Sequence, residues 1–576
     1  MGGPFVKARR DWQARIHRSS GEVTTVPPVD LPPPGGLRAT PGRGCVTLTW
    51  EPVPGATGYT VERSPFREGP YGVTSQPDVD VAAVPSCRYV DTGQDPCWYR
   101  VSAVGGPAGS PVHGSPGGSG VATVEVSGTV ARELPRPWRF MIGSEHLSYM
   151  FEEKELVEAL RLAHTELGVA TVRAHAILDE VRILDDGYDF SRVDQIYDTL
   201  MEIGLRPVVE LSFMPEELAS DPSKTVFGYE AIISPPKDWD AWGDLVRALT
   251  QHCADRYGLQ ELVDNWAFEV WNEPNLEVFW SGTPEEYFRL YEISVAAVKD
   301  VHPDLRVGGP SSAANGWVEE LIARDLPVDF VSTHTYGNAP LDWRPALARH
   351  GREGTPIWWT EWGPTPTHFH GIGDGPFGAS FLLHGIKSAA GRLEALSHWV
   401  ASDHFEELGR PPRLFHGGFG LLSVGNLRKP RWWALELANR LGDEELAAKV
   451  GGDAGGVEVW AARRADGTVG VLLWNGTLNQ AKADGDPDLS RTITVTVDGL
   501  GEGEHTVTHH RIDERHSNIR AHWHGKADWP TGEEWETLRA ANVLEELTPP
   551  VTTSGSTIRV AFDLPMPGVS YLEITA

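Results

Sequence analysis

Between about residues 137 and 440 the chain alternates short apolar runs with longer segments of helical period. The short runs are rich in β-branched and aromatic residues, which is typical of strands. The segments between them, such as KELVEALRLAHTEL (154–167) and SRVDQIYDTLMEIG (191–204), place apolar residues three and four positions apart, as amphipathic helices do. Eight runs have the character of strands: WRFMIGS (138–144), VATVRAH (169–175), RPVVELSF (206–213), WAFEVWNE (266–273), RVGGPS (306–311), DFVSTH (329–334), PIWWTEW (356–362) and LSHWVAS (396–402).

Eight strand–helix units over this length predict an α/β fold, a (β/α)8 barrel of the TIM type, which we place at residues 129–440. An open, doubly wound sheet is the structural alternative. Such a sheet binds nucleotide phosphates through a Gly-rich loop after its first strand. No Gly-rich phosphate loop follows WRFMIGS, so the pattern favours the barrel.

Strand-like runs also lie on both sides of the barrel region. Before it, short alternating runs separated by turn residues predict a small β-sandwich over residues 33–128, with its last strand after the Gly/Ser-rich passage 105–120. After it, residues 441–576 return to strand-like runs and predict a second β-sandwich. Residues 1–32 are a terminal segment followed by a Pro/Gly-rich linker, and we allow for one strand of this segment in the second sandwich.

The charge balance argues against several classes of partner. The chain carries 80 acidic and 50 basic residues, a net charge of −30, and no basic stripe compensates locally, so no nucleic-acid ligand is expected. No run of roughly 18 apolar residues occurs, so no membrane span is expected. The N-terminal sequence MGGPFVKARRDWQARIH lacks the apolar core of a signal peptide, which predicts a cytoplasmic location unless a leader has been removed.

Two residue types refine this picture. The chain contains 22 Trp, and indole rings form platforms in sugar-binding clefts as well as parts of ordinary cores. The four Cys are too few for a disulfide scaffold and lack the spacing of metal ligands. Cys87 and Cys97 are near enough in sequence for a local bridge, and buried free thiols are the alternative.

The chemistry is concentrated where two predicted strands end. WAFEVWNEPN ends in Asn272 and Glu273, and PIWWTEW carries Glu361. In a (β/α)8 barrel the reacting groups lie at the carboxyl ends of the strands. Three strand–helix units separate the two glutamates, which places them on the fourth and seventh strands, across the rim from each other. Two facing carboxyl groups are the minimum apparatus for hydrolysis of a glycosidic bond.

The residues around these glutamates also resemble a known family. FEVWNEPNLEVFW, with TEW downstream, resembles the clan of barrel glycosidases that have glutamates on strands four and seven. More narrowly, the chain resembles glycoside hydrolase family 39, the family of β-xylosidases and α-L-iduronidase, over residues 137–525. The further matching runs are RAHAILDE, VGGPSS, DFVSTHTYG, SHWVASDHFEELG, FHGGFGLL and HRIDERHSN.

The first predicted sandwich resembles a fibronectin type III module. Trp50, in its second strand, and the WYRVSAV run near its end carry this resemblance. Such modules are usually spacers or interaction surfaces, so no catalytic role is expected for residues 33–128.

The family resemblance implies that Glu273 is the acid/base and Glu361 the nucleophile of a double displacement with retention. Glu273 must then be protonated at the start, so we expect a raised pKa for it. Glu361 must be ionised and supplied with hydrogen-bond donors. Retention requires the two carboxyl groups to be roughly 5–5.5 Å apart.

The resemblance also implies a set of substrate-binding residues on the strand ends. Asn272 resembles the clan's donor to the sugar 2-hydroxyl, and its alternative is a turn residue. His175 matches a sugar-contacting histidine, where a lone histidine would otherwise be structural. His334 and Tyr336 match a pair in the glycone pocket, and Tyr336 is also a candidate hydrogen-bond donor to the nucleophile.

Two more candidates lie at the end of the eighth predicted strand and in the segment after it. Trp399 is expected to be the platform under the sugar ring. Glu407 resembles a residue that binds hydroxyl groups of the glycone, with a solvated loop charge as its alternative. Asp403 and Glu406 are nearby alternatives for the same role.

We therefore predict a retaining exo-glycoside hydrolase that acts on a small glycoside or an oligosaccharide end, with β-D-xyloside as the first choice. An α-L-iduronidase-like activity, or action on β-glucosides, galactosides or arabinose-containing glycans, stays open because loops set specificity on a common barrel. A non-catalytic carbohydrate-binding protein is the alternative from another class. The mechanism needs no metal and no organic cofactor. A homo-oligomer is compatible with the sequence, which leaves the oligomeric state and the aglycone open.

Overall fold

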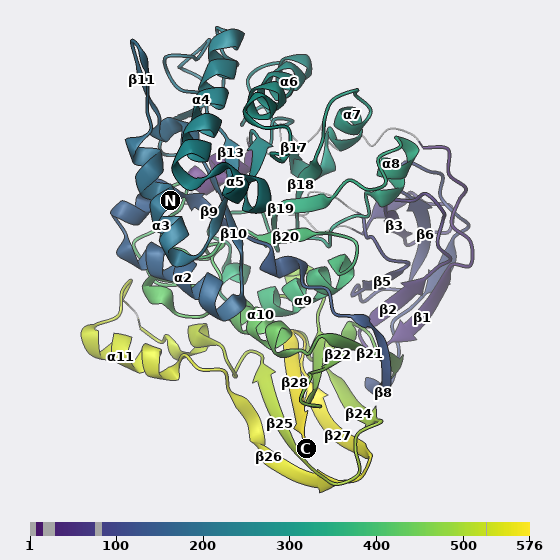
Figure 1. Cartoon of the computed structure of the whole chain (residues 1–576). Coiled ribbons are helices and arrows are strands. Elements are labelled where there is room, and N and C mark those ends of the chain that lie inside the picture. Colours follow the sequence, from purple (N-terminus) through teal and green to yellow (C-terminus); the bar gives the residue numbers. More distant parts are fainter. Residues whose placement is uncertain (1–6, 15–28, 75–82, 526) are drawn as a thin grey trace.

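A computed structural model describes residues 7–14, 29–74, 83–525 and 527–576. Eight parallel strands close into a barrel in chain order, each inside one of the eight predicted runs or overlapping it (Figure 1). The predicted (β/α)8 barrel is thus confirmed. The strands are β9 Met141–His146, β10 Thr171–His175, β13 Arg206–Leu211, β16 Ala267–Val270, β17 Val307–Ser312, β18 Phe330–Tyr336, β19 Ile357–Gly363 and β20 Ala395–His398.

Helices surround the barrel. The first, α2, buries Leu156, Ala159, Leu160 and Ala163 on one face, which is the three- and four-residue spacing of the sequence. It ends at Gly168, whose φ of 70° suits a residue without a side chain. The helices are α2 Lys154–Leu167, α3 Ser191–Ile203, α4 Trp239–Tyr257, α5 Leu259–Asn265, α6 Pro284–Val301, α7 Val318–Ile322, α8 Arg344–Arg349, α9 Phe377–Ala389 and α10 Pro430–Arg440. No helix among the described residues is long and apolar enough to cross a membrane.

Side chains fill the barrel interior in layers. Met141, Val208, Phe330 and Trp358 belong to an apolar cluster contributed by strands around the barrel. Two positions further along its strand, Val208 is followed by Glu210, which is fully buried. Because side chains alternate along a strand, Val208 and Glu210 face the same side. A charged layer therefore lies above the apolar layer, towards the carboxyl ends of the strands.

Two short hairpins extend the loops of the barrel. One joins β11 (Arg182–Leu184) to β12 (Gly187–Asp189), and the other joins β14 (Thr225–Val226) to β15 (Ala231–Ile232). The second hairpin belongs to the long connection between β13 and α4, at the carboxyl end of the barrel.

Two sheets form the N-terminal part of the chain. One has the order β1-β2-β5 and the other β4-β3-β6-β7. Side chains from β2, β3 and β6 join one apolar cluster, which places a shared core between the sheets. Membership of the fibronectin type III family stays a prediction. The strands are β1 Arg38–Gly42, β2 Cys45–Thr49, β3 Tyr59–Ser64, β4 Gly72–Val73, β5 Arg88–Asp91, β6 Cys97–Ala103 and β7 Val112–Gly114.

The Cys87–Cys97 bridge is not present, because all four cysteines are free thiols. Cys97 begins β6 in the four-stranded sheet, whereas Cys87 immediately precedes β5 in the other sheet. The two residues are close in sequence, but their strands belong to opposite layers.

The C-terminal part is a nine-stranded sheet with the order β26-β25-β28-β23-β22-β21-β8-β24-β27 (Figure 1). Eight of its strands contribute to a single apolar cluster, so the sheet curls around a core of its own. The strands are β8 Val121–Glu133, β21 Glu444–Gly452, β22 Val457–Arg463, β23 Val469–Asn475, β24 Arg491–Asp498, β25 Glu504–Ile512, β26 Glu546–Ser554, β27 Thr557–Leu564 and β28 Gly568–Thr575, with helix α11 Gly532–Ala541 between β25 and β26.

Strand β8 differs from the expected arrangement. We expected residues 121–128 to complete the N-terminal module, but β8 pairs with β21 and with β24. The short strand β7, which pairs with β6, is the last strand of the N-terminal sheets. Residues 7–14 form a short helix and not a strand of the C-terminal sheet. The predicted linker over residues 21–36 lies partly outside the described residues, and the predicted domain boundaries stay a prediction.

Candidate active site

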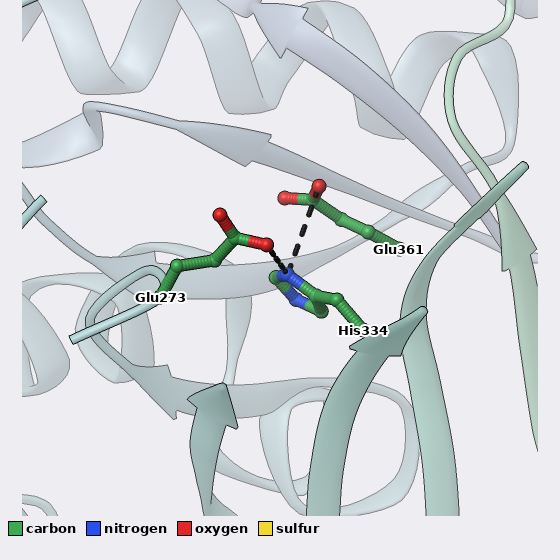
Figure 2. Close-up of side chains that lie close together, drawn as sticks. All are labelled: Glu273, His334 and Glu361. Atoms are coloured by element: carbon green, nitrogen blue, oxygen red, sulfur yellow. Dashed lines mark hydrogen bonds and ion pairs between the residues drawn. The ribbon is translucent and has the colours of Figure 1, made fainter. Parts of the chain in front are cut away.

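Glu273 and Glu361 lie at the carboxyl end of the barrel and point towards each other (Figure 2). Glu361 is part of β19, the seventh strand, and Glu273 follows β16, the fourth. The chain turns sharply between β16 and Glu273, since Trp271 has a φ of 72° and Glu273 a φ of 45°. One carboxylate oxygen of each glutamate lies within 4.8 Å of the other. Both side chains are nearly buried, with 8% and 5% of the residue exposed.

His334, from β18, lies between the two glutamates (Figure 2). Its Nδ1 is 2.8 Å from Glu273 Oε1 and 3.7 Å from Glu361 Oε2. Its Nε2 is 3.1 Å from Thr360 Oγ1, and that hydroxyl donates its own hydrogen to Glu269 Oε1. The Thr360 oxygen can therefore only accept a hydrogen bond from Nε2–H of His334.

The protonation of His334 follows from its surroundings. Burial lowers its pKa well below the usual value, and the positive charges of Arg173 and His175 lower it further. His334 is thus neutral, with its hydrogen on Nε2, and its Nδ1 presents a lone pair. A lone pair at 2.8 Å from Glu273 Oε1 favours a hydrogen on that oxygen.

Arg173, on β10, organises the charged layer beneath the glutamates. Its guanidinium donates to Glu361 Oε1 at 2.7 Å and to Asn272 Oδ1 at 2.9 Å. It is also ion-paired with Glu210 and Glu269, at 2.6 and 2.5 Å. Burial disfavours its charge, but these carboxylates outweigh burial and raise its pKa. The sequence interpretation missed Arg173, although a lone arginine in the apolar strand VATVRAH was a usable signal.

Glu361 receives two strong hydrogen bonds, from Arg173 and from Tyr336. The Tyr336 hydroxyl donates to Glu361 Oε2 at 2.8 Å, which is the contact that we expected. Burial raises the pKa of the Glu361 carboxyl, while Arg173, His175 and the Tyr336 hydroxyl oppose that rise. Burial and the neighbouring Glu361 and Glu273 raise the pKa of Tyr336, so its hydroxyl keeps its hydrogen.

His175 joins the two sides of the site. Its Nδ1 is 2.9 Å from Glu210 and its Nε2 is 3.2 Å from Glu407. Burial lowers its pKa, but Glu210 and Glu407 outweigh burial and raise it to about 10, so His175 is a cation at neutral pH. Its ring centroid is 4.7 Å from that of Trp399, which follows β20 directly. Gly143 lies against the Trp399 ring, where a side chain would collide with the indole.

Of the three acidic candidates after β20, Glu407 is the one that contacts the site. It lies 3.2 Å from His175, as above, whereas Glu406 binds His416 at 2.7 Å. Asp403 is ion-paired with Lys429 at 2.5 Å. Asp403 and Glu406 thus have partners of their own, which for Glu406 include His368 in the loop after β19, and Glu407 is turned towards the strand ends.

Among the described residues, two groups of side chains have ligand atoms near enough together to hold a metal ion: Glu273, His334 and Glu361, and Asp403, Glu406 and His416. The ammonium group of Lys429 already supplies a positive charge to Asp403 in the second group. The hydrogen bonds within the first group are those of an acid–base pair, so its geometry has an explanation without a cation.

Stacked aromatic side chains form a wall along one side of the site, and the sequence interpretation did not identify the outermost of them, Trp12. Phe227, in the β14–β15 hairpin, stacks on His175 with ring centroids 5.9 Å apart. Trp12, from the short N-terminal helix, stacks on Phe227 at 5.5 Å and meets Phe279 and His368 edge-on at 5.7 and 5.6 Å. No local pattern connected Trp12 with residues more than 200 positions away.

The chain is similar to known proteins over the barrel and the C-terminal sheet. The sequence profile of glycosyl hydrolases family 39 matches residues 123–350 and 346–557. A β-xylosidase of Caldicellulosiruptor saccharolyticus is 34% identical over 418 residues, which are 67% of this chain and 84% of the relative. A β-xylosidase of Geobacillus stearothermophilus is 32% identical over 463 residues, which are 73% of this chain and 88% of the relative.

A solved structure is similar over the same part of the chain. The crystal structure of a monomeric β-xylosidase from Caulobacter crescentus CB15 superimposes with a TM-score of 0.70 at 28% identity. The match covers 78% of this chain and 99% of that protein.

Proposed function

Because the chain belongs to glycosyl hydrolase family 39, and is therefore a glycoside hydrolase, we propose that it is a retaining exo-acting β-D-xylosidase. One observation carries the proposal. Two carboxylates at the carboxyl rim approach within 4.8 Å, and a neutral histidine accepts a hydrogen bond from one while an arginine binds the other. This spacing is that of retaining enzymes, in which no water fits between the carboxyl groups.

The hydrogen bonds support different protonation states for the two carboxyl groups. The Nδ1 lone pair of His334 holds a hydrogen on Glu273, as a general acid requires. Arg173 and the Tyr336 hydroxyl stabilise the negative charge of Glu361, as a nucleophile requires. The environment thus separates the roles of two chemically identical side chains. A raised pKa of Glu273 stays a prediction.

In the first step a Glu361 oxygen attacks the anomeric carbon while the Glu273 proton moves to the leaving oxygen. The bond to the leaving group breaks, and the sugar is held as an ester of Glu361. The negative charge of Glu361 is consumed in this bond, so Glu273 is now stable as a carboxylate. In the second step Glu273 takes a proton from water, the water oxygen bonds to the anomeric carbon, and Glu361 is released.

Two neighbours are placed to help at the transition state. Asn272 accepts a hydrogen bond from Arg173 with its side-chain oxygen, so its amide NH2 group is turned away from Arg173 and can donate to the sugar 2-hydroxyl. Trp399, held between Gly143 and His175, offers a platform to the apolar face of the sugar ring.

The surroundings favour a small, uncharged glycone. The reacting carboxyl groups are nearly buried, which suits a closed pocket that accepts a chain end. Within the described residues, Arg173 is already bonded to three carboxylates, and His175 lies between Glu210 and Glu407. A uronic acid would add a further carboxylate to this site, where Arg173 and His175 are already paired with protein carboxylates. The relatives named as β-xylosidases support the same choice.

A panel of 4-nitrophenyl glycosides tests the substrate. We expect kcat/KM for the β-D-xyloside to exceed that for the β-glucoside, β-galactoside and glucuronide by at least about tenfold, since a pocket shaped for xylose has no room for a C6 group. The α-L-arabinoside lacks C6 and tests recognition of the hydroxyl configuration instead. Proton NMR of the reaction should show β-xylose as the first product. A faster glucuronide would overturn the xylose assignment. No turnover of any glycoside, with binding of xylo-oligosaccharides retained, would favour a carbohydrate-binding protein.

A further inference from the structure

Glu145 is a buried carboxyl group in the site that the mechanism above does not use. It lies near the end of β9, the first barrel strand, and only 3% of the residue is exposed. Both of its carboxyl oxygens are buried, and neither has a hydrogen-bond partner within the part of the chain that the structure describes. Nearly all buried polar groups in proteins are hydrogen-bonded, so an unpaired carboxyl group calls for an explanation.

The backbone brings the Glu145 side chain to the site. In the ladder between β9 and β10, Ser144 pairs with Ala174 and His146 pairs with His175, so Glu145 is the extra residue of a β-bulge. Bulges re-aim side chains and occur next to active sites. Two positions before the bulge, the Gly143 carbonyl accepts a hydrogen bond from the Ala401 N–H, in the loop that also carries Trp399.

Charged groups from several loops face Glu145. Its carboxyl group interacts with the carboxylates of Glu406, Glu407 and Asp403, after β20, and of Glu361, on β19. Burial, followed by these like charges, raises its pKa well above the usual value, which favours the neutral acid. A neutral carboxyl group has one O–H donor as well as acceptor oxygens.

A second unpaired group lies nearby. The Tyr229 hydroxyl, from the β14–β15 hairpin, is buried without a hydrogen-bond partner among residues 7–14, 29–74, 83–525 and 527–576, and it interacts electrostatically with Glu407, Glu210 and Glu145. Its ring packs edge-on against that of His146, the residue after Glu145, with centroids 4.8 Å apart. Tyr229 therefore packs beside the strand end that carries Glu145, and neither group has a hydrogen-bond partner among the described residues.

We propose that Glu145 is a specificity-determining residue that binds a hydroxyl group of the glycone, together with Tyr229. A sugar hydroxyl is both donor and acceptor, so it satisfies the O–H and the C=O of a neutral acid at once. The proposal rests on the proposed function, because it requires a sugar in this pocket.

Glu145→Gln and Glu145→Ala test this role, with Glu152→Gln, an exposed glutamate in the following turn, as the control. Glutamine keeps one donor and one acceptor, so kcat/KM on the β-xyloside should stay within about threefold of the wild type. Alanine removes both and should lower kcat/KM by about 10- to 100-fold, mainly through KM. Equal loss in both variants, or no loss in either, would overturn the proposal.

The pH dependence of stability tests the protonated state of Glu145, which the proposed contact requires. A group with a raised pKa in the folded state stabilises the protein fully below its unfolded pKa and loses that contribution as pH rises through the folded pKa. The wild type should therefore lose thermal stability relative to Glu145→Gln as pH rises from 4 to 8, so the difference between their thermal midpoints should shift in favour of the variant. A wild type that cleaves no xyloside would refute the proposed function, whereas an active wild type with unaffected variants would refute only the Glu145 inference.

A different observation concerns the short helix 7–14, which lies across the mouth of the barrel. Trp12 contacts loops that follow β13, β16 and β19, through Phe227, Phe279 and His368. Strands β13 and β16 are neighbours, and β19 is three strands further around the barrel. Arg9 and Gln13 add hydrogen bonds to Phe369 and Thr367, on the β19 side.

The contacts of Trp12 exclude a role as a stacking platform. Only 7% of the residue is exposed, with Phe227 stacked on the indole and two further rings packed perpendicular to it. We infer that Trp12 is a wall that restricts the site to glycosides with a short leaving group. This inference also rests on the proposed function.

Trp12→Ala tests the wall, with Trp98→Ala, in the N-terminal sheet, as the control. The ratio of kcat/KM for xylotetraose to that for xylobiose should rise at least fivefold in Trp12→Ala and stay constant in Trp98→Ala. An unchanged ratio in Trp12→Ala, or a lower one, would overturn the inference. Loss of all xyloside hydrolysis in the wild type would instead refute the proposed function.

Discussion

Replacing Glu361 by glycine is expected to lower kcat by about 10⁴-fold or more on every glycoside, because no other group can form the covalent intermediate. The Arg173 guanidinium and the Tyr336 hydroxyl, which bind the Glu361 carboxylate in the wild type, would then face a small cavity. Azide fits such a cavity and carries the negative charge that these donors stabilise. We expect azide to restore turnover of an activated xyloside such as the 2,4-dinitrophenyl derivative.

The product of the rescued reaction identifies the role of Glu361. Azide attacks from the face that Glu361 occupied, so the product should be the α-xylosyl azide, with inverted configuration, measurable by NMR. Glu353→Gly, an exposed position before β19, serves as the control and should keep wild-type kcat. Near-normal kcat in Glu361→Gly, without formation of the α-azide, would refute the nucleophile assignment.

Glu273→Ala should slow substrates according to the quality of their leaving group. With a 2,4-dinitrophenyl xyloside the first step needs no acid, so it should proceed near the wild-type rate while the second step, which needs the base, becomes rate-limiting. A burst of dinitrophenol followed by slow turnover is the expected signature. With xylobiose both steps need Glu273, and kcat/KM should fall by about 10²- to 10⁴-fold.

The matched control for this variant is Glu277→Ala, an exposed glutamate four residues further along the same loop. Circular dichroism and thermal unfolding should show that both variants fold, since Glu273 lies at a left-handed backbone position that alanine adopts less readily. Uniform loss on all leaving groups, without a burst, would contradict the acid/base role of Glu273.

The barrel and its two glutamates were accessible from the sequence because their signals are local. Buried strands and one-sided helices have distinct periods, and eight alternations allow few architectures. Asn272 and Glu273 end one predicted strand and Glu361 lies near the end of another, so the barrel rule alone brings them together. The family resemblance then supplied roles for His175, His334, Tyr336, Trp399 and Glu407, which the structure gathers around the same rim but does not test.

Several interactions of buried charged residues exist only because the sheet closes into a barrel, so the sequence did not predict them. Arg173 bonds to carboxylates of three other strands, and its role follows from that set of partners and not from its neighbours in sequence. Glu145 belongs to the site because of a bulge, which breaks the two-residue period on which strand patterns rest. The hydrogen on Glu273 follows from a chain of contacts through His334 and Thr360.

The sequence by itself determined the elements, their order and the two carboxyl groups, because periodicity and strand ends are properties of short segments. Only the tertiary structure decided which distant segments meet. It placed β8 in the C-terminal sheet, kept Cys87 and Cys97 apart and brought Trp12 over the barrel mouth. These contacts join residues tens to hundreds of positions apart, and their free energy comes from apolar surface and hydrogen bonds that exist only once the chain has folded.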